Sequence, residues 1–160
     1  MKLSVLLDTS FFIRLLNDED PLHKNAVGYY KHYLETGVDC QISTISVAEY
    51  CVRGTINELP LRNLKILPFN ITHAVRAGEF ADIIFREKKL SGIELNPRPI
   101  IPNDSKLFAQ ADIEESISHF VTSDTRSLRT FAMLSNNIRP RFTVQDISVP
   151  YNEAFGLLEL

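Results

Sequence analysis

Short apolar runs alternate with amphipathic stretches along this chain. Residues 3–7 form a nearly continuous apolar run, which is typical of a strand buried on both faces. In residues 72–88 the apolar side chains recur every three or four positions, which predicts a helix. The expected strands are 3–7, 41–45, 119–122 and 142–144, and the expected helices are 11–16, 21–36, 46–53, 72–88, 104–115 and 127–134.

The alternation of these elements predicts an α/β domain with a mostly parallel central sheet. Residues 64–69 fit either a short strand or a connection between helices. Residues 90–102 contain three prolines and a glycine and are expected to form a loop. We expect one domain over residues 1–146, followed by a tail, residues 147–160, that packs on the domain or on a partner.

The composition supports a single globular domain. The chain has 160 residues, of which 44% are hydrophobic and 23% charged, so it can bury a core and stay soluble. These proportions exclude a disordered, collagen-like or coiled-coil chain as a description of the whole. The formal net charge of -3, from 17 basic and 20 acidic residues, gives no overall positive field that would attract a nucleic acid.

The sequence also bears on the cellular environment. No stretch approaches the roughly 20 apolar residues that a membrane-spanning helix needs. No signal-peptide pattern opens the chain, so we expect a cytoplasmic protein that does not bind a membrane. The two cysteines, Cys40 and Cys51, are too few for a disulfide framework, and we expect them to be reduced, partly buried thiols.

Four acidic residues lie where predicted elements meet. They are Asp8 and Asp124, which follow predicted strands, and Glu49 and Asp104, which lie near predicted helix starts. Ligands of an open parallel sheet bind beyond the carboxyl ends of its strands, so we expect these side chains to converge there. Gathered carboxylates repel one another unless a cation neutralises them, and hard ions such as Mg²⁺ or Mn²⁺ prefer oxygen ligands. Such a metal site can activate water for attack on a phosphodiester.

Each of these acids also has a purely structural interpretation. Asp8, Asp104 and Asp124 could be helix N-caps that accept hydrogen bonds from free backbone amides. Ser46 with Glu49 matches the Ser-x-x-Glu capping box. Caps are common, so one acid alone would not indicate a site, whereas four at element junctions favour one.

Four motifs around these acids resemble those of the PIN-domain ribonucleases, and within them the VapC-type toxins of toxin–antitoxin pairs. The first two are Leu-Leu-Asp-Thr-Ser at 6–10 and Ile-Ser-Val-Ala-Glu at 45–49. The third is Asn103-Asp104 followed by Leu107, Ala109 and Ala111, and the fourth is Val-Thr-Ser-Asp at 121–124. Their order, spacing and predicted context agree over roughly residues 3–144, which is most of the chain.

The resemblance implies a three-layer α/β/α PIN-like fold and a Mg²⁺- or Mn²⁺-dependent endoribonuclease. It implies that the catalytic acids are Asp8, Glu49, Asp104 and Asp124. Of these, Asp8, Asp104 and Asp124 would be the metal ligands. Glu49 would hold metal-bound water or help to activate the nucleophile.

Some residues near the motifs leave alternatives open. Asp112 lies two turns beyond Asp104 in the same predicted helix and is a second candidate for the third acid. The residues that directly follow Asp124 are not acidic, although many relatives have a further acid there, so a second metal has less support. Thr9 and Thr122 could hydrogen-bond to the acids or stabilise local turns.

Basic side chains near the acids change the meaning of the net charge. Residues 125–144 contain four arginines and no acid, and a second basic group flanks or lies within the loop 90–102. The residues expected to contact RNA phosphates are Arg126, Arg129, Lys88, Lys89 and Arg98. A mildly acidic chain is therefore compatible with an RNA-cutting enzyme once a metal neutralises its acidic cluster.

The sequence leads to the hypothesis of a metal-dependent endoribonuclease that is the toxin of a toxin–antitoxin pair. As implications of the resemblance, its substrate is RNA, its partner is an antitoxin and it forms a homodimer. One alternative is a PIN nuclease with a housekeeping role in RNA processing and no antitoxin. Another is a non-catalytic RNA- or protein-binding PIN-like domain whose acids serve as helix caps.

Overall fold

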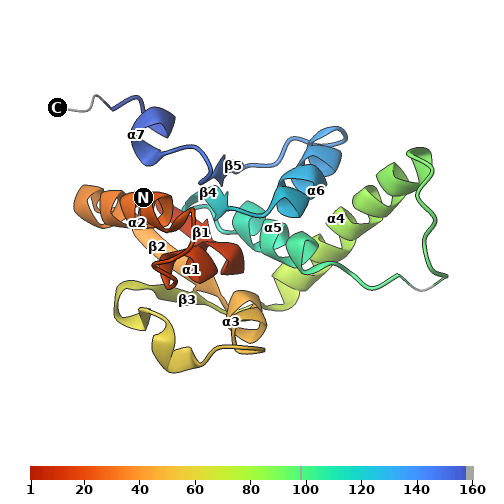
Figure 1. The fold of residues 1–160 in the computed structure, drawn as a ribbon. Helices are drawn as coiled ribbons and strands as arrows, with labels where there is room; N and C mark the ends of the chain where they lie inside the picture. The colour runs from red at the N-terminus through yellow and green to blue at the C-terminus, as the bar shows by residue number, and fades with distance from the viewer. Residues whose placement is uncertain (98, 158–160) are drawn as a thin grey trace.

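A parallel sheet separates two layers of helices in the computed structural model, which describes residues 1–97 and 99–157 (Figure 1). The elements of these residues are β1 (Ser4–Leu7), α1 (Thr9–Leu15), α2 (His23–Thr36), β2 (Asp39–Ser43), α3 (Thr44–Tyr50), the 3-10 turns η1 (Ile56–Glu58) and η2 (Leu61–Asn63), β3 (Lys65–Leu67), α4 (Ile71–Leu90), α5 (Asn103–Ile113), β4 (Ile117–Thr122), α6 (Thr125–Ser135), β5 (Thr143–Asp146) and α7 (Tyr151–Ala154). The predicted α/β class and the three-layer α/β/α arrangement with a parallel central sheet are confirmed.

The strand order places β1 at the centre of the sheet. Within the described residues the order is β3-β2-β1-β4-β5, and each neighbouring pair is parallel. The chain first adds β2 and β3 on one side of β1 and later adds β4 and β5 on the other. The segment 64–69, for which the sequence left two interpretations, contains β3. The reversal of strand order at β1 creates a crevice beyond the carboxyl ends of β1 and β4, where ligands of such sheets bind.

Each face of the sheet has its own apolar core because successive strand side chains point to opposite faces. Val5 and Leu7 of β1 pack with buried residues of α1 and α2, including Phe12. Leu6 packs on the other face with residues of α4, α5 and α6, including Phe108. All four residues of β1 are buried, as the nearly continuous apolar run predicts.

The structure corrects the predicted caps near two of the acids. β2 ends at Ser43, whose hydroxyl accepts a hydrogen bond from the first turn of α3 and caps that helix. The predicted capping box of Ser46 with Glu49 is therefore wrong, because Ser46 lies inside α3 and is buried. The interpretation of Asp104 as an N-cap is also wrong, because α5 begins one residue before it.

The end of the described chain packs on α2. The His32 ring stacks on Phe155 with 4.6 Å between ring centroids, and Tyr151 lies beside His32. A Cβ atom at Gly28 would lie 2.5 Å from Cδ1 of Tyr151, so this close approach requires a glycine. Tyr151 and Phe155 of the predicted tail thus pack on the domain, and the last three residues of the tail lie outside the described part of the chain.

Two further expectations concern the membrane and the cysteines. Among the helices of the described residues, none combines the length and apolar character needed to cross a bilayer. Both cysteines are free thiols, and Cys40 is buried. Cys51 is exposed, so the expectation that both thiols are partly buried is wrong for this residue.

Candidate active site

Four acidic residues from four parts of the chain approach one another beyond the carboxyl ends of β1 and β4. Asp8 joins β1 to α1, and Asp124 is the N-cap of α6 just after β4. Glu49 lies in the last turn of α3, and Asp104 lies in the first turn of α5. The backbone N–H of Asp8 donates to the carbonyl of Val121 at 2.9 Å, which joins the two strand ends at this edge.

Asp8 is a buried carboxylate, only 5% exposed, and three donors fix its orientation. The backbone N–H of Thr9 donates to Oδ1 at 2.7 Å, while the hydroxyls of Ser10 and Thr122 donate to Oδ2 at 3.0 and 2.8 Å. Burial raises the pKa of Asp8 to about 6; the negative charge of Asp104 adds to this, and the three hydrogen bonds oppose it. A bound cation would relieve both the burial cost and the repulsion.

Two hydroxyl groups connect Asp8 to the turn after β4. The Ser10 hydroxyl donates to Asp8 and accepts the backbone N–H of Ser123 at 3.0 Å. The Thr122 hydroxyl also donates to Asp8 and accepts the backbone N–H of Asp124 at 3.0 Å. Because each hydroxyl bridges the carboxylate and the turn, the positions of Asp8 and Asp124 are coupled.

Thr9 links two of the acids. Its backbone N–H donates to the carboxylate of Asp8, which caps α1, and its hydroxyl donates to Oε1 of Glu49 at 2.9 Å. Both Thr9 and Thr122, for which the sequence left open a role at the acids or in a local turn, therefore hydrogen-bond to the acids.

Asp104 is held in the cluster by the neighbouring helix α6. The hydroxyl of Ser127, which is 1% exposed, donates to Oδ1 of Asp104 at 3.0 Å. Burial raises the pKa of Asp104, and the negative charges of Asp124 and Glu49 raise it further. The hydrogen bond from Ser127 and the positive charge of Arg126 act in the opposite direction. Asp104 therefore interacts electrostatically with the acids of three other elements.

The donor set of the cluster fits a hard divalent cation. All of its ligand atoms are oxygens, and burial together with like charge raises the pKa of two of its members, Asp8 and Asp104. In residues 1–97 and 99–157, no three His, Cys, Asp or Glu side chains are close enough together to form a complete direct ligand set. Mg²⁺ typically keeps several of its waters and binds through one or two carboxylates, so the residues fit an ion that is held partly through water.

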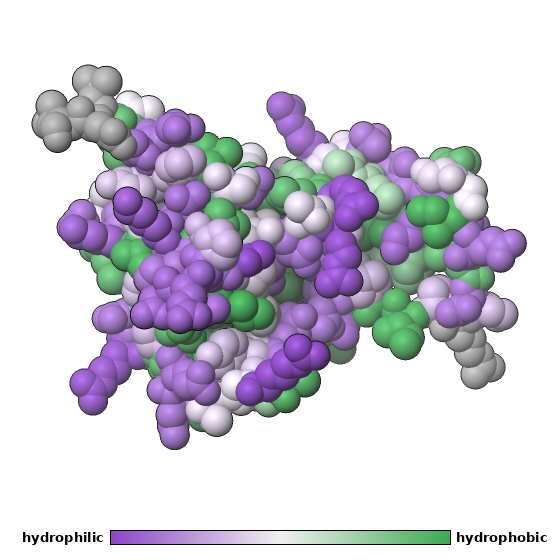
Figure 2. Space-filling model, viewed as in Figure 1, coloured by the Kyte–Doolittle hydropathy of each residue, from purple (hydrophilic) through white to green (hydrophobic). Residues whose placement is uncertain are grey.

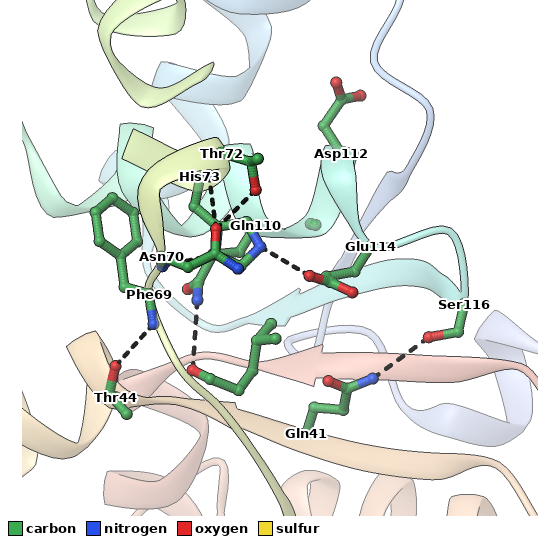
Figure 3. Close-up of polar contacts among 12 residues, drawn as sticks. Gln41, Thr44, Phe69, Asn70, Thr72, His73, Gln110, Asp112, Glu114 and Ser116 are labelled. Carbon is green, nitrogen blue, oxygen red and sulfur yellow. Dashed lines mark hydrogen bonds and ion pairs between the residues drawn. The ribbon is translucent and has the colours of Figure 1, made fainter. Parts of the chain in front are cut away.

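Asp112, the second candidate for the third acid, lies at the opposite end of α5. Its Oδ1 accepts the backbone N–H of Arg141 at 2.8 Å. Figure 3 shows it near Glu114, in the last turn of the helix, with its carboxylate directed away from the polar contacts drawn there. Eight residues separate it from Asp104, which corresponds to about 12 Å along the helix axis. Asp104, and not Asp112, lies with the other acids.

A groove with a volume of about 540 Å³ lies beside the acids, between α6, the end of α4 and the start of α5. Three acids and three cations line it: Glu49, Asp104, Asp124, Lys88, Arg126 and Arg129. In Figure 2 the middle of the molecule is hollowed, with strongly hydrophilic side chains around the hollow. Lys89 lines a separate cavity of about 310 Å³ between α4 and the proline-rich loop. Arg98 lies outside the described residues.

Two serines of the site were not predicted. Ser10 lies two residues after Asp8, a spacing at which a serine hydroxyl can reach the preceding carboxylate, so the sequence contained a signal for this contact. Ser127 lies three residues after Asp124, and only the packing of α6 beside the start of α5 brings it to Asp104. Spacing alone could not have shown which acid it contacts.

Comparisons with known proteins agree with this fold. The family model of the PIN domain matches residues 5–132. Among curated proteins, no sequence matches this chain. The structure is similar to that of VapBC2 from Rickettsia felis bound to a DNA fragment from its promoter, with 19% identity and a TM-score of 0.57 over 90% of this chain and 98% of that one. It is also similar to DNA-bound VapBC from Salmonella typhimurium, with 19% identity and a TM-score of 0.53 over 91% of this chain and 98% of that one. Because the family model covers most of its length, the chain belongs to the PIN-domain family.

Proposed function

We propose that this protein is a Mg²⁺- or Mn²⁺-dependent endoribonuclease, a hydrolase that cuts RNA phosphodiester bonds in the cytoplasm. The observation that carries the proposal is the approach of four carboxylates from four elements at the switch point of the sheet. Two of them, Asp8 and Asp104, are held by hydroxyl donors although burial and like charge raise their pKa values. Gathering buried carboxylates in this way destabilises their charged forms. This cost favours a functional role for the cluster over simple helix capping.

In this mechanism Asp8, Asp104 and Asp124 would hold the divalent ion, partly through water. Such an ion, when bound, would act as a Lewis acid toward the phosphate and would lower the pKa of water. The hydroxyls of Ser10 and Thr122 keep Asp8 oriented. Ser127 keeps Asp104 oriented in the same way.

Glu49 has a different environment from the three proposed ligands. It is partly exposed, lines the groove and accepts one hydrogen bond, from the hydroxyl of Thr9. A carboxylate in this position can accept a proton from an attacking water that enters from the groove. We therefore assign Glu49 to the activation of the nucleophile.

The cations of the groove are suited to the substrate backbone. Lys88 on α4 and Arg126 and Arg129 on α6 line the same groove as the acids. Arg126 has a side chain that is 82% exposed, so it can turn toward a phosphate without breaking a buried contact. These three residues would bind phosphates on either side of the cut, whereas Lys89 would act only at the rim.

We further propose that the protein is the toxin of a toxin–antitoxin pair, inhibited by an antitoxin, and that it forms a homodimer. The support is the similarity of its fold to chains in two complexes named VapBC. Expression of the wild type should arrest growth, and a co-expressed antitoxin should relieve the arrest. Expression without growth arrest would favour the housekeeping nuclease.

The nuclease activity is tested on a total-RNA pool with Mn²⁺ or with EDTA, and the cut ends are mapped. The wild type should cleave only with the metal, and Asp8→Asn should not cleave although its circular dichroism spectrum is unchanged. Asp18→Asn, at an exposed aspartate before α2, is the matched control and should cleave normally. Equal cleavage by Asp8→Asn, or cleavage in EDTA, would contradict the mechanism.

A further inference from the structure

The groove extends along α6 well beyond the acidic cluster. Arg126, Arg129, Thr130 and Met133 all line it, and their spacing of three, four and seven residues places them on one face of the helix. Met133 lies nine residues after Asp124, which corresponds to about 13 Å along the axis of α6. A stacked nucleic-acid strand rises about 3.4 Å per nucleotide, so this length spans up to about four nucleotides.

The turn after α6 contacts α4 close to the far part of the groove. In that turn the side-chain amide of Asn137 donates to Oε1 of Glu87 at 2.8 Å, four residues after Met133. Lys88, the neighbour of Glu87, lines the groove. The amide of Asn137 also donates to the carbonyl of Met133 at 3.1 Å, so the contact links the backbone of Met133 to the neighbour of Lys88, and both residues line the groove.

The side chains in this part match the surface of a nucleobase. Met133 offers a polarisable thioether, which makes favourable contacts with aromatic rings. Arg129 offers a planar guanidinium, which stacks on bases, and Lys88 offers a charge for a phosphate or a base carbonyl. The hydroxyl of Thr130 donates to the carbonyl of Arg126 at 2.9 Å, so this donor is already engaged within the helix.

The size of the groove also favours a nucleotide over a duplex. Its volume of about 540 Å³ lies within the range of about 300–1,000 Å³ for sites that bind small ligands. A hydrated metal ion and one phosphate beside the acids would leave the region near Met133 empty. An unpaired base next to the cut phosphate would fill that region.

We propose that Met133, Arg129 and Lys88 form a nucleobase subsite, which binds one unpaired base of the RNA strand within a few nucleotides of the cut. The proposal rests on the proposed nuclease function and adds base recognition to it. Met133 provides the apolar contact with the base, Arg129 and Lys88 contact the base as well as the adjoining phosphate, and Arg126 contributes only to phosphate binding.

The test compares RNA strands with and without bases. Fluorescein-labelled ten-nucleotide strands of adenylate, of uridylate and of abasic ribose phosphate are titrated with Asp8→Asn protein, which leaves the strands uncut, and anisotropy is measured. The protein should bind at least one of the strands with bases about tenfold more tightly than the abasic strand, given the strength of a sulfur–aromatic contact. Adding Met133→Ala should reduce this ratio to about two or less without changing affinity for the abasic strand.

Three further variants control the comparison. Met133→Leu keeps the apolar volume but removes the sulfur, so its ratio should lie between those of the wild type and Met133→Ala, and an unchanged circular dichroism spectrum excludes a folding defect as the cause. Val75→Ala, at an exposed residue of α4 outside the groove, should leave the ratio unchanged. Arg126→Gln should lower the affinity of the protein for all three strands by the same factor.

Equal affinity for strands with and without bases would overturn the proposal. An affinity ratio that is unchanged by Met133→Ala would also overturn it. The absence of binding to any strand would overturn it as well. The cleavage assay on total RNA tests the nuclease activity separately. Cleavage by a protein that binds strands with and without bases equally well would mean a nuclease that lacks this subsite. A base-dependent ratio without cleavage leaves a base-binding groove in a protein that does not cut RNA.

Discussion

Removal of the negative charge of Asp8 should make the metal-free protein more stable at neutral pH. The Asp8 carboxylate is 5% exposed and lies near the charge of Asp104, and burial raises its pKa from 3.8 to about 6. The folded protein therefore keeps the Asp8 proton up to about pH 6, whereas the unfolded chain releases it near pH 3.8. Because the folded state binds more protons within this window, the free energy of unfolding falls as the pH rises through it.

The size of the effect follows from the pKa shift and the hydrogen bonds. A shift from 3.8 to about 6, at about 1.4 kcal/mol per pKa unit, corresponds to about 3 kcal/mol of lost stability above pH 6. Asparagine avoids this loss but weakens the hydrogen bonds from Ser10 and Thr122, at about 0.5–1.5 kcal/mol each. The expected net gain for Asp8→Asn at pH 7.5 is therefore about 1 kcal/mol, the middle of a range from about 0 to about 2 kcal/mol.

Urea unfolding in EDTA, at pH 4 and at pH 7.5, measures this difference. Asp8→Asn should be more stable than the wild type at pH 7.5, and its advantage should disappear at pH 4, where Asp8 is protonated in the folded protein. Saturating Mg²⁺ in place of EDTA should raise the stability of the wild type, by about 2.7 kcal/mol at a hundred times the Kd, and should affect Asp8→Asn less. Asp18→Asn, at an exposed site, is the control and should follow the wild type at both pH values.

Two results would refute this reasoning. If Asp8→Asn is no more stable than the wild type at pH 7.5, then burial and the charge of Asp104 do not destabilise the Asp8 carboxylate. If Asp8→Asn keeps its advantage at pH 4, then the advantage does not come from the ionisation of Asp8.

Three other substitutions test separate parts of the structure. Ser127→Ala removes the donor to Asp104 and should weaken Mn²⁺ binding about 10- to 100-fold in calorimetric titration, with the melting temperature nearly unchanged; unchanged affinity would argue against this positioning role. Gly28→Ala places a Cβ atom 2.5 Å from Tyr151 and should release the C-terminal segment, so limited proteolysis should cleave before α7 sooner than in the wild type; equal resistance would show that the ring can move aside. His73 is fully buried, and Figure 3 shows it linked to Glu114, so His73→Ala should lower the free energy of unfolding by about 2–4 kcal/mol in urea titration; a loss below about 1 kcal/mol would mean that the site relaxes around the cavity.

The strands and helices could be predicted largely from local pattern. The apolar run at 3–7 contains the central strand β1, because a strand buried on both faces needs apolar side chains on both. The errors lie at boundaries, where one hydrogen bond decides which residue caps a helix. The capping box expected for Ser46 failed because Ser43 already caps α3, and both serines fit the local pattern.

The candidate acids were also found from local position, since Asp8 and Asp124 follow strands whose ends meet in a parallel sheet. The residues that lie beside these two acids were harder to predict from the sequence. The choice between Asp104 and Asp112 depends on which end of α5 lies at the crevice, and both residues occur on the same predicted helix. Likewise, Lys88 and Lys89 are adjacent in the sequence, yet only Lys88 lines the groove beside the acids.

The sequence by itself determined the α/β class, the parallel sheet and the four acids at element junctions, because strand period, helix period and turn residues are local properties of the chain. Only the tertiary structure decided that Ser127 supports Asp104, that Arg126 and Arg129 share a groove with the acids, and that Met133 extends it. These relations depend on the packing of α6 against α5 and α4. That packing joins residues far apart in the chain through the burial of apolar side chains, and no local pattern encodes which polar groups it brings into contact.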